Sequence, residues 1–393
     1  MDRRGFLKTA ASTGLGVAAM KKLGPEAWAQ GSDHGLKTKH IILIMNGNGA
    51  RKKEYYERED IAIKIRPMLE KSTVFEEDHG THVSNHGYMF TEYLTGLDVS
   101  SDQPMFPTFQ HYARKANRDA ASKYWYVNPV SYYRQWRFHR KYYTSHPDFG
   151  QETRGASLQA HDAFYDGQDM TAAEIVKQQF TRDMDLTAKE LSHIEDFVDG
   201  VLKNRLWEPT LETPYPQRTP HVQEGHALAL VPHVLQEFKP RIITVQMVAH
   251  DTGHGAGGYL RDETGYLDYS DVARSTDEMF GQIYDFVRND PYFSTNTAII
   301  IRPETGRDDE VNLYGEIHHS DGYYYAHRPA SVWYGPDFKE GTRITDVVNR
   351  MDMAPTLAWM MGAEKTMAKG YVRNHMFKDH VTGLPEYKSI SHY

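Results

Sequence analysis

The apolar run HIILIM spans residues 40–45 and passes directly into the polar, glycine-containing sequence NGNG at residues 46–49. Apolar runs of this length, bounded by turn residues, are typical of strands that are buried on both faces of a parallel sheet. Three more runs have the same form: RIITVQMVA (241–249), NTAIIIR (296–302) and ASVWYG (330–335). The sequence therefore predicts a sheet that contains these four buried, parallel strands.

Helical patterns lie between these runs, at residues 104–116, 187–204, 270–290 and 345–362. The second of them opens on Thr187 with Glu190 three residues later, which is the pattern of a capping box. Strands that alternate with helices predict an α/β fold, with a mostly parallel central sheet flanked by helices on both faces. In such sheets the ligand site lies beyond the carboxyl ends of the strands, so the loops there are where chemistry is expected.

The composition limits the classes of function. The chain has 393 residues, 45 of them basic and 53 acidic, with a formal net charge of −8. This argues against nucleic acid as a partner, because phosphate affinity comes mostly from clustered Lys and Arg. The absence of cysteine excludes disulfides, thiolate metal ligands and a cysteine-derived nucleophile. Outside the N-terminus no segment approaches the ~20 apolar residues of a membrane span, and nothing specifies an oligomeric state.

Residues 1–29 have the order of a signal peptide, with a basic start, a weakly apolar stretch and a small-residue AWA at the end. Arg3 and Arg4, followed by Phe6, Leu7 and Lys8, resemble the twin-arginine export signal. We expect cleavage after residue 29 and a location in the periplasm, or another exported location, reached by the twin-arginine route.

Six motifs follow the predicted strands and helices in a characteristic order. They are NG (46–47), NHGYMFTEYLTG (85–96), HDTGHGAGGYL (250–260), RPETG (302–306), AHRPASVWYGPDF (326–338) and MDMAPTLAWMMG (351–362). Their order resembles the alkaline phosphatase superfamily, which includes sulfatases, nucleotide pyrophosphatases and phosphonate hydrolases. The resemblance covers roughly residues 38–110 and 224–365.

The resemblance implies a single alkaline-phosphatase-like α/β domain over residues 30–373. A Tyr- and Trp-rich stretch at about 119–223 is interpreted as an insertion over the sheet edge or a contact surface, and residues 374–393 as a polar C-terminal tail. The implied activity is the hydrolysis of small anionic phosphate or sulfate esters. Members of the superfamily hold two cations with carboxylates and imidazoles, beside a nucleophile.

The sequence departs from the family pattern at the metal ligands. Asn46 stands where the family has an Asp, and Thr305 stands where it has a His. A neutral amide is a poor ligand for a divalent ion, so an intact two-metal centre is not expected. In the loop after residue 249, one alignment gives the acidic position to His250. Another gives it to Asp251 and shortens its spacing to His254.

The nucleophile position is equally open. Counting back from Thr95 and the glycine that follows it, without gaps, the position falls on His86. A change in loop length brings Thr81 or Ser84 there instead. Asn85 is placed to contact an anionic oxygen, although asparagine beside glycine is also a common turn former.

The candidate metal ligands are Asn46, His250, Asp251, His254, Glu304 and His327. Imidazole and carboxylate donors suit a single divalent ion such as Zn, Mn, Fe or Ca. The leading hypothesis is therefore an exported, sulfatase- or phosphatase-like hydrolase with an altered metal centre. One alternative is a catalytically degenerate member in which these side chains hold one another. Its crevice would bind an anion, or its Tyr- and Trp-rich surface would bind a partner. A further alternative is a His-rich metal protein with non-hydrolytic chemistry.

Overall fold

The computed structural model describes residues 34–47, 49–52, 56–81, 86–98, 106–129, 156–167, 169–180, 186–210, 220–247, 250, 269–307, 319, 324–363 and 365–387. For residues 86–88, 90 and 220–222 it describes the backbone alone. The predicted signal peptide and four of the candidate site residues lie outside these ranges: Ser84, Asn85, Asp251 and His254.

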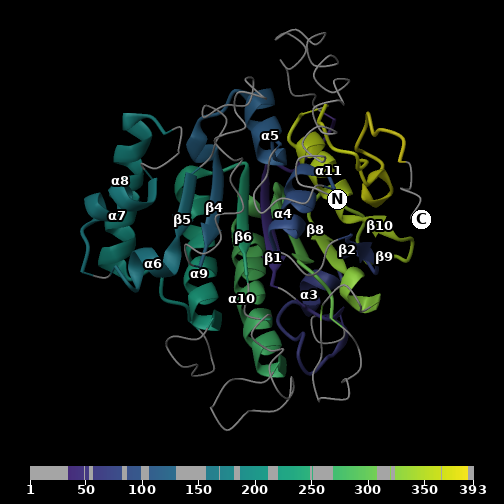
Figure 1. Cartoon of the computed structure of the whole chain (residues 1–393), viewed down its shortest axis with the longest axis horizontal. Coiled ribbons are helices and arrows are strands. Elements are labelled where there is room, and N and C mark those ends of the chain that lie inside the picture. Colours follow the sequence, from purple (N-terminus) through teal and green to yellow (C-terminus); the bar gives the residue numbers. More distant parts are fainter. Residues whose placement is uncertain are drawn as a thin grey trace, which may run out of the picture.

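The described strands form one large sheet and one small one (Figure 1). The large sheet has eight strands in the order β5-β4-β6-β1-β7-β8-β2-β9. Their bounds are β1 (His40–Asn46), β2 (Ser72–Phe75), β4 (Tyr124–Asn128), β5 (Ala156–Gln159), β6 (Ile242–Gln246), β7 (Thr297–Pro303), β8 (Ser331–Tyr334) and β9 (Thr342–Ile344). The small sheet pairs β3 (Asp78–His79) with β10 (Val348–Asn349).

The strand β1 lies inside the sheet, between two parallel neighbours. Ile41 pairs with Ile242 of β6 on one side and with Ala298 of β7 on the other. The predicted parallel strands β1, β6 and β7 are thus confirmed. The prediction for β8 is wrong in direction, because β8 runs antiparallel to both β7 and β2. A parallel neighbour needs a crossover helix, and the described residues between β7 and β8 form one short helix, η10 (Tyr324–His327).

Helices cover both faces of the large sheet, as predicted. Their bounds are α3 (Arg66–Leu69), α4 (His86–Thr95), α5 (Phe109–Asn117), α6 (Ala160–Phe164), α7 (Ala172–Phe180), α8 (Ala188–Asn204), α9 (Pro220–Phe238), α10 (Tyr269–Asn289) and α11 (Met353–Met360). The shorter ones are η3 (Ala121–Lys123), η9 (Phe293–Thr295), η10, η11 (Arg350–Asp352) and η12 (Asn374–Met376). Among these described helices none is long and apolar enough to cross a membrane.

Alternate residues of each strand enter two separate cores. In β1, Ile42 and Ile44 belong to a core with α9 and α10, while Ile41, Leu43 and Met45 belong to a core with α5 and α11. Figure 1 shows these helix pairs on the two sides of the sheet. Because both faces of β1 are covered, residues 41–45 are all apolar, which is why the run stood out as a buried strand.

The predicted capping box of α8 is confirmed. The Thr187 hydroxyl accepts from the backbone N–H of Glu190 at 3.2 Å, and the Glu190 carboxylate accepts from the backbone N–H of Thr187 at 3.0 Å.

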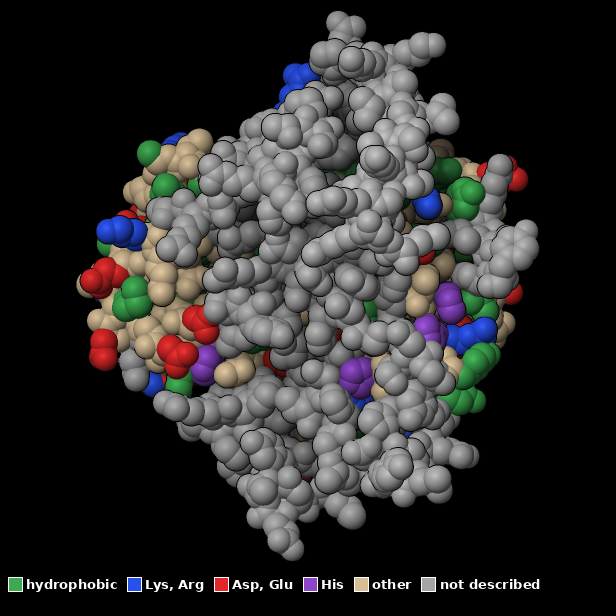
Figure 2. Space-filling model, viewed as in Figure 1, with side chains coloured by type: hydrophobic (Ala, Val, Ile, Leu, Met, Phe, Trp, Pro, Cys, Tyr) green, Lys and Arg blue, Asp and Glu red, His purple; other side chains and the backbone are tan. Residues whose placement is uncertain are grey.

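On the outer side of the molecule, α7 and α8 present a mixed surface of acidic and basic side chains (Figure 2).

Two stretches contribute more to the fold than their sequences indicated. Within residues 119–223, β4 and β5 extend the large sheet itself rather than covering its edge. Trp125 enters one core and Tyr126 the other, so an aromatic strand is buried on both faces. The segment expected as a polar tail likewise packs on the domain, because Met376 and Phe377 are buried.

Candidate functional site

The carboxyl ends of β1, β6 and β7 meet at one edge of the large sheet. Met45 pairs with Gln246, and Asn46 pairs with Pro303. Beyond these pairs the loops after β1 and β7 are hydrogen-bonded. The N–H of Glu304 donates to the carbonyl of Gly47 at 3.1 Å. The edge predicted to carry chemistry therefore brings Asn46 and Glu304 onto neighbouring strand ends.

Two glycines let side chains pack directly against the turn after β1. Both have positive φ angles, 46° at Gly47 and 76° at Gly49. A Cβ on Gly47 would lie 3.2 Å from Nδ1 of His250. One on Gly49 would lie 2.7 Å from Nε of Arg307, which is too close for a real contact. The turn is therefore shaped to hold an imidazole and a guanidinium against its backbone.

Tyr269, the first residue of α10, connects these groups. Its ring meets His250 edge-on, with centroids 5.4 Å apart, and the Arg307 guanidinium lies 4.8 Å above the ring centroid. The Tyr269 hydroxyl donates to the carbonyl of Gly49 and accepts from the N–H of Arg51, both at 2.8 Å. Arg307 donates to the carbonyl of His250 at 2.7 Å. Tyr269 thereby fixes the positions of both His250 and Arg307.

Asn46 and Thr305 differ in their hydrogen bonds. The Thr305 hydroxyl accepts from the N–H of Gly49 at 2.8 Å, so it holds the turn together. Asn46 is fully buried, and neither its Oδ1 nor its Nδ2 has a hydrogen-bond partner among the described residues. His250 and Glu304 beside it are at most 2% exposed. Asn46 is thus a buried amide at this edge without a hydrogen-bond partner among the described residues.

His327 contacts residues 79–80, and not the strand ends that carry Asn46 and Glu304. Its Nδ1 is 2.8 Å from the carbonyl of Gly80, whose N–H donates back to the His327 carbonyl, also at 2.8 Å. Its ring also stacks on His79. Thr81, which follows Gly80, is exposed and donates its N–H to the Glu92 carboxylate at 3.1 Å. His327 therefore holds the segment that leads to His86, the first residue of α4.

A buried ionic cluster lies behind this segment, and no local pattern in the sequence indicates it. The Asp78 carboxylate accepts from both Nη atoms of Arg373, at 2.8 and 2.9 Å, and lies 3.3 Å from Nε of Arg302. Arg350 lies 3.6 Å from Glu92. Burial alone would raise the pKa of Asp78, but the guanidinium groups of Arg373 and Arg302 outweigh it and bring the pKa to about 2. Asp78 is therefore ionised at neutral pH.

The described residues at this edge supply few metal donors. In the part of the chain that the structure describes, no group of three His, Asp or Glu side chains could hold a metal ion. One amide, one imidazole and one carboxylate stand at the edge, from Asn46, His250 and Glu304. The Arg307 guanidinium packs on the same turn. A pair of divalent cations needs more negative ligands than these residues supply.

Asp277 is a buried carboxylate of α10. It accepts backbone hydrogen bonds from Ile63, Lys64 and Ile65, at 2.7 to 3.0 Å. Burial raises the pKa of Asp277 in spite of these bonds. Asp277 thus anchors residues 63–65 to α10.

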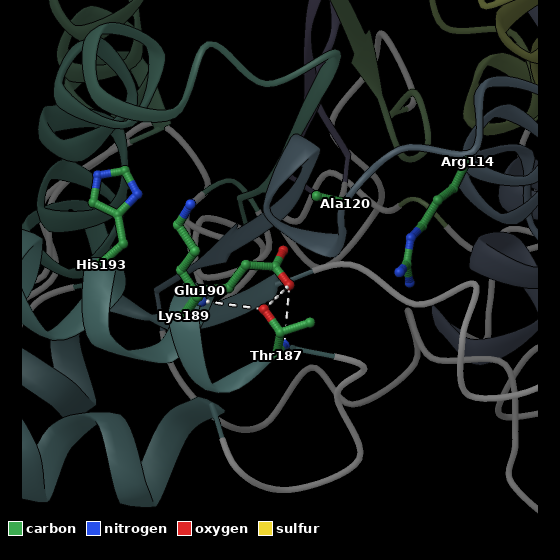
Figure 3. A pocket seen from close by; sticks show the side chains of 6 residues that line it. All are labelled: Arg114, Ala120, Thr187, Lys189, Glu190 and His193. Atoms are coloured by element: carbon green, nitrogen blue, oxygen red, sulfur yellow. Dashed lines mark hydrogen bonds between the residues drawn. The ribbon is translucent and has the colours of Figure 1, made fainter.

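A cavity of about 500 Å³ lies away from this edge, between α5 and the start of α8 (Figure 3). Its lining consists of Arg114, Ala120, Thr187, Lys189, Glu190 and His193. Ala120 directly precedes η3 and β4, so the cavity is at the amino ends of the strands. Figure 3 shows that Thr187 and Glu190 bind each other in the capping box. The cavity is therefore separate from the candidate site.

Solved structures share this architecture. A sulfatase, PsFucS1, from Pseudoalteromonas sp. is 11% identical, with a TM-score of 0.51 over 94% of this chain and 76% of that one. A phosphonate monoester hydrolase of Agrobacterium radiobacter is 10% identical, with a TM-score of 0.49 over 86% of this chain and 79% of that one. A mutant of the alkaline phosphatase PafA is 9% identical, with a TM-score of 0.49 over 87% and 99%.

No protein-family model matches the sequence, and no curated protein does either. At these identities the likeness to solved structures concerns the fold. The sulfatase similarity extends over nearly the whole chain and agrees with the mostly parallel eight-stranded sheet. The chain therefore has the alkaline-phosphatase-like α/β fold that its motifs predicted.

Proposed function

We propose that this chain is an exported hydrolase of phosphate or sulfate esters that works with an altered metal centre. The observation that carries the proposal is the buried, unpartnered Asn46 side chain at the carboxyl end of the central strand. Leaving a buried amide without hydrogen bonds costs roughly 1–3 kcal/mol. Such a cost is expected where a group is kept ready for a ligand.

The centre would use donors from three strand ends. Asn46 offers a neutral oxygen, while His250 offers an imidazole and Glu304 a carboxylate. Asp251 and His254 follow His250 in the sequence and would complete a set for one divalent ion. A bound cation would polarise the ester oxygen. The chain's own contribution is to hold these donors rigidly, through Tyr269 and the bond between Thr305 and Gly49.

Two candidate nucleophiles stand near the start of α4. Thr81 is exposed and its backbone is held by Glu92, while His86 begins the helix. Thr81→Ala and His86→Ala, measured separately, identify the one that is needed. Residues 1–29 support export, and the periplasm is the proposed location.

The test is elemental analysis of the full-length, exported protein together with turnover on a panel of aryl phosphates and aryl sulfates. We expect roughly one ion per chain, lost in Asn46→Leu and His254→Ala. His193→Ala, at an exposed histidine that pairs with Glu237, is the matched control and should keep its metal. Metal below roughly a tenth of an ion per chain, with no turnover, would refute the proposal.

A specific observation also favours a second function, a binding protein without catalysis. The Thr305 hydroxyl and the Arg307 guanidinium both bind neighbouring loop backbone, so these two side chains hold the loops in place. In that case the edge would bind a ligand or partner without turning it over. Saturable turnover that His254→Ala abolishes would eliminate this second function.

A further inference from the structure

A second group of buried amides lies on the other face of the sheet. Gln246 ends β6 and is fully buried, and neither Oε1 nor Nε2 has a partner among the described residues. Asn128 ends β4 and is 1% exposed, with Oδ1 unpartnered within the same part of the chain. Gln110 on α5 is 2% exposed; its Nε2 donates to the Thr244 hydroxyl at 2.8 Å, but its Oε1 has no partner there either.

The register of the sheet brings these three amides together. Val127 pairs with Val245, and both enter the core with α9 and α10. The next residues, Asn128 and Gln246, therefore point to the opposite face, on strands about 5 Å apart. Thr244 points to that same face two residues earlier, and through it Gln110 reaches the pair from α5.

This amide group is distinct from Asn46. Along β1, Ile42 and Ile44 enter the core with α9 and α10, so Asn46 continues that face. The three other amides continue the face of α5 and α11. At this end of the sheet, Asn46 therefore lies on one face and the three other amides on the opposite face.

The chemistry of the unpartnered atoms restricts the ligand. They comprise three carbonyl oxygens, from Gln110, Asn128 and Gln246, and the NH₂ of Gln246. Fully ionised phosphate or sulfate offers only acceptors and cannot satisfy three carbonyl oxygens. A buried cation would need a carboxylate partner, and all three side chains are neutral. A ligand with several hydroxyl groups both donates and accepts, and carries no charge.

We propose that Gln246, Asn128 and Gln110 form a binding subsite for a neutral, hydroxyl-rich ligand such as a sugar. The subsite does not depend on the proposed ester hydrolysis, because amides bind sugar hydroxyls whether or not an ester group is present. An unpartnered buried amide destabilises the ligand-free protein. A bound ligand that satisfies the amide would restore that stability.

The stability of the ligand-free protein therefore tests whether the amide is unsatisfied. Gln246→Met replaces the amide with an apolar side chain of similar size. In the ligand-free, full-length protein it should raise the unfolding midpoint by roughly 2 °C, because it removes an unsatisfied buried group. Gln179→Met is the matched control. Gln179 is also buried, but its Oε1 accepts from the N–H of Gln159 at 3.3 Å, so this change should lower the midpoint.

The binding arm uses a panel of neutral methyl hexopyranosides, with inorganic sulfate and phosphate as charged probes. We expect at least one glycoside to give a saturable rise in the wild-type midpoint. The same glycoside should bind about tenfold more weakly to Gln246→Met, as expected for one lost hydrogen bond. Gln179→Met should keep the wild-type affinity.

Three results would overturn the proposal. The first is a lower midpoint for Gln246→Met, because that would show the amide to be satisfied in the ligand-free protein. The second is a stabilised Gln246→Met with no glycoside binding to the wild type, since the amides would then hold internal water. The third is a response to sulfate or phosphate that depends on Gln246 while no glycoside responds, because the site would then take anions.

Discussion

Replacing Asp78 by asparagine would leave two buried guanidinium groups facing a neutral amide. The Asp78 carboxylate accepts two hydrogen bonds from Arg373 and lies 3.3 Å from Arg302, and all three side chains are fully buried. Arg302 also donates to the backbone carbonyl of Asp78, at 3.0 Å. The change therefore removes the carboxylate that joins the end of β7 to β3 and to the C-terminal segment.

Two routes give the size of the effect. The pKa of Asp78 falls from 3.8 to about 2, and each pKa unit corresponds to about 1.4 kcal/mol, so charging this group stabilises the fold by roughly 2–3 kcal/mol. Breaking a buried ion pair by removing one partner costs about 3–5 kcal/mol, because the other charge stays buried. We expect Asp78→Asn to lower the free energy of unfolding by about 3–5 kcal/mol at pH 7.

The assay is equilibrium unfolding in urea, followed by tryptophan fluorescence, at pH 7 and at lower pH. Because the folded pKa is depressed, the contribution is present above the unfolded pKa of 3.8 and is lost as the pH falls towards 2. The difference between wild type and variant should shrink over that window. The control is Glu208→Gln, at an exposed pair with Arg205, which should change stability by less than about 1 kcal/mol. A loss below about 1 kcal/mol for Asp78→Asn would refute the reasoning.

Three further changes test other contacts by urea unfolding. Thr305→Ala leaves the buried N–H of Gly49 without its acceptor and should cost about 1–3 kcal/mol; a neutral result would show that the turn does not need the hydroxyl. Gly80→Ala places a Cβ 1.5 Å from Nη2 of buried Arg350 and should cost about 3 kcal/mol, whereas an unchanged midpoint would contradict that packing. Burial, with His161 nearby, lowers the pKa of His226 from 6.5 to about 3, so below pH 6.5 the unfolded chain binds the extra proton and acid destabilises the fold. His226→Phe should remove up to about 1.4 kcal/mol of that loss per pH unit, and parallel pH profiles would exclude this role.

The sequence predicts this fold best where strands are buried on both faces. The runs of β1, β6 and β7 are mostly apolar, and the structure confirms all three strands. The direction of β8 was missed because direction depends on the connection, which composition does not encode. The strand β4 was missed because YWYVN resembles a contact surface until its neighbours show that both faces are covered.

The candidate site could be predicted only in part, for a related reason. Asn46 and Glu304 lie at neighbouring strand ends and His250 packs on the turn after Asn46, because parallel strands end at one edge and the residues after them meet there. His327 was assigned to the same set, but its contacts are with His79 and Gly80. Gln246 lies inside a predicted strand, and a single polar residue in an apolar run is an ordinary feature until its missing partners are seen.

The position of β1 inside the sheet also has a consequence for the order of synthesis. Among the described strands β1 is made first, and it cannot pair with β6 or β7 until Ile242 and then Ala298 have been made. Contacts between residues so far apart in the sequence form slowly. The chain between them must lose conformational entropy before the strand pairing offsets that loss. The apolar run 40–45 therefore stays without its sheet partners through more than half of translation. A chaperone that binds extended apolar segments would find its target there, and the completed sheet would release it.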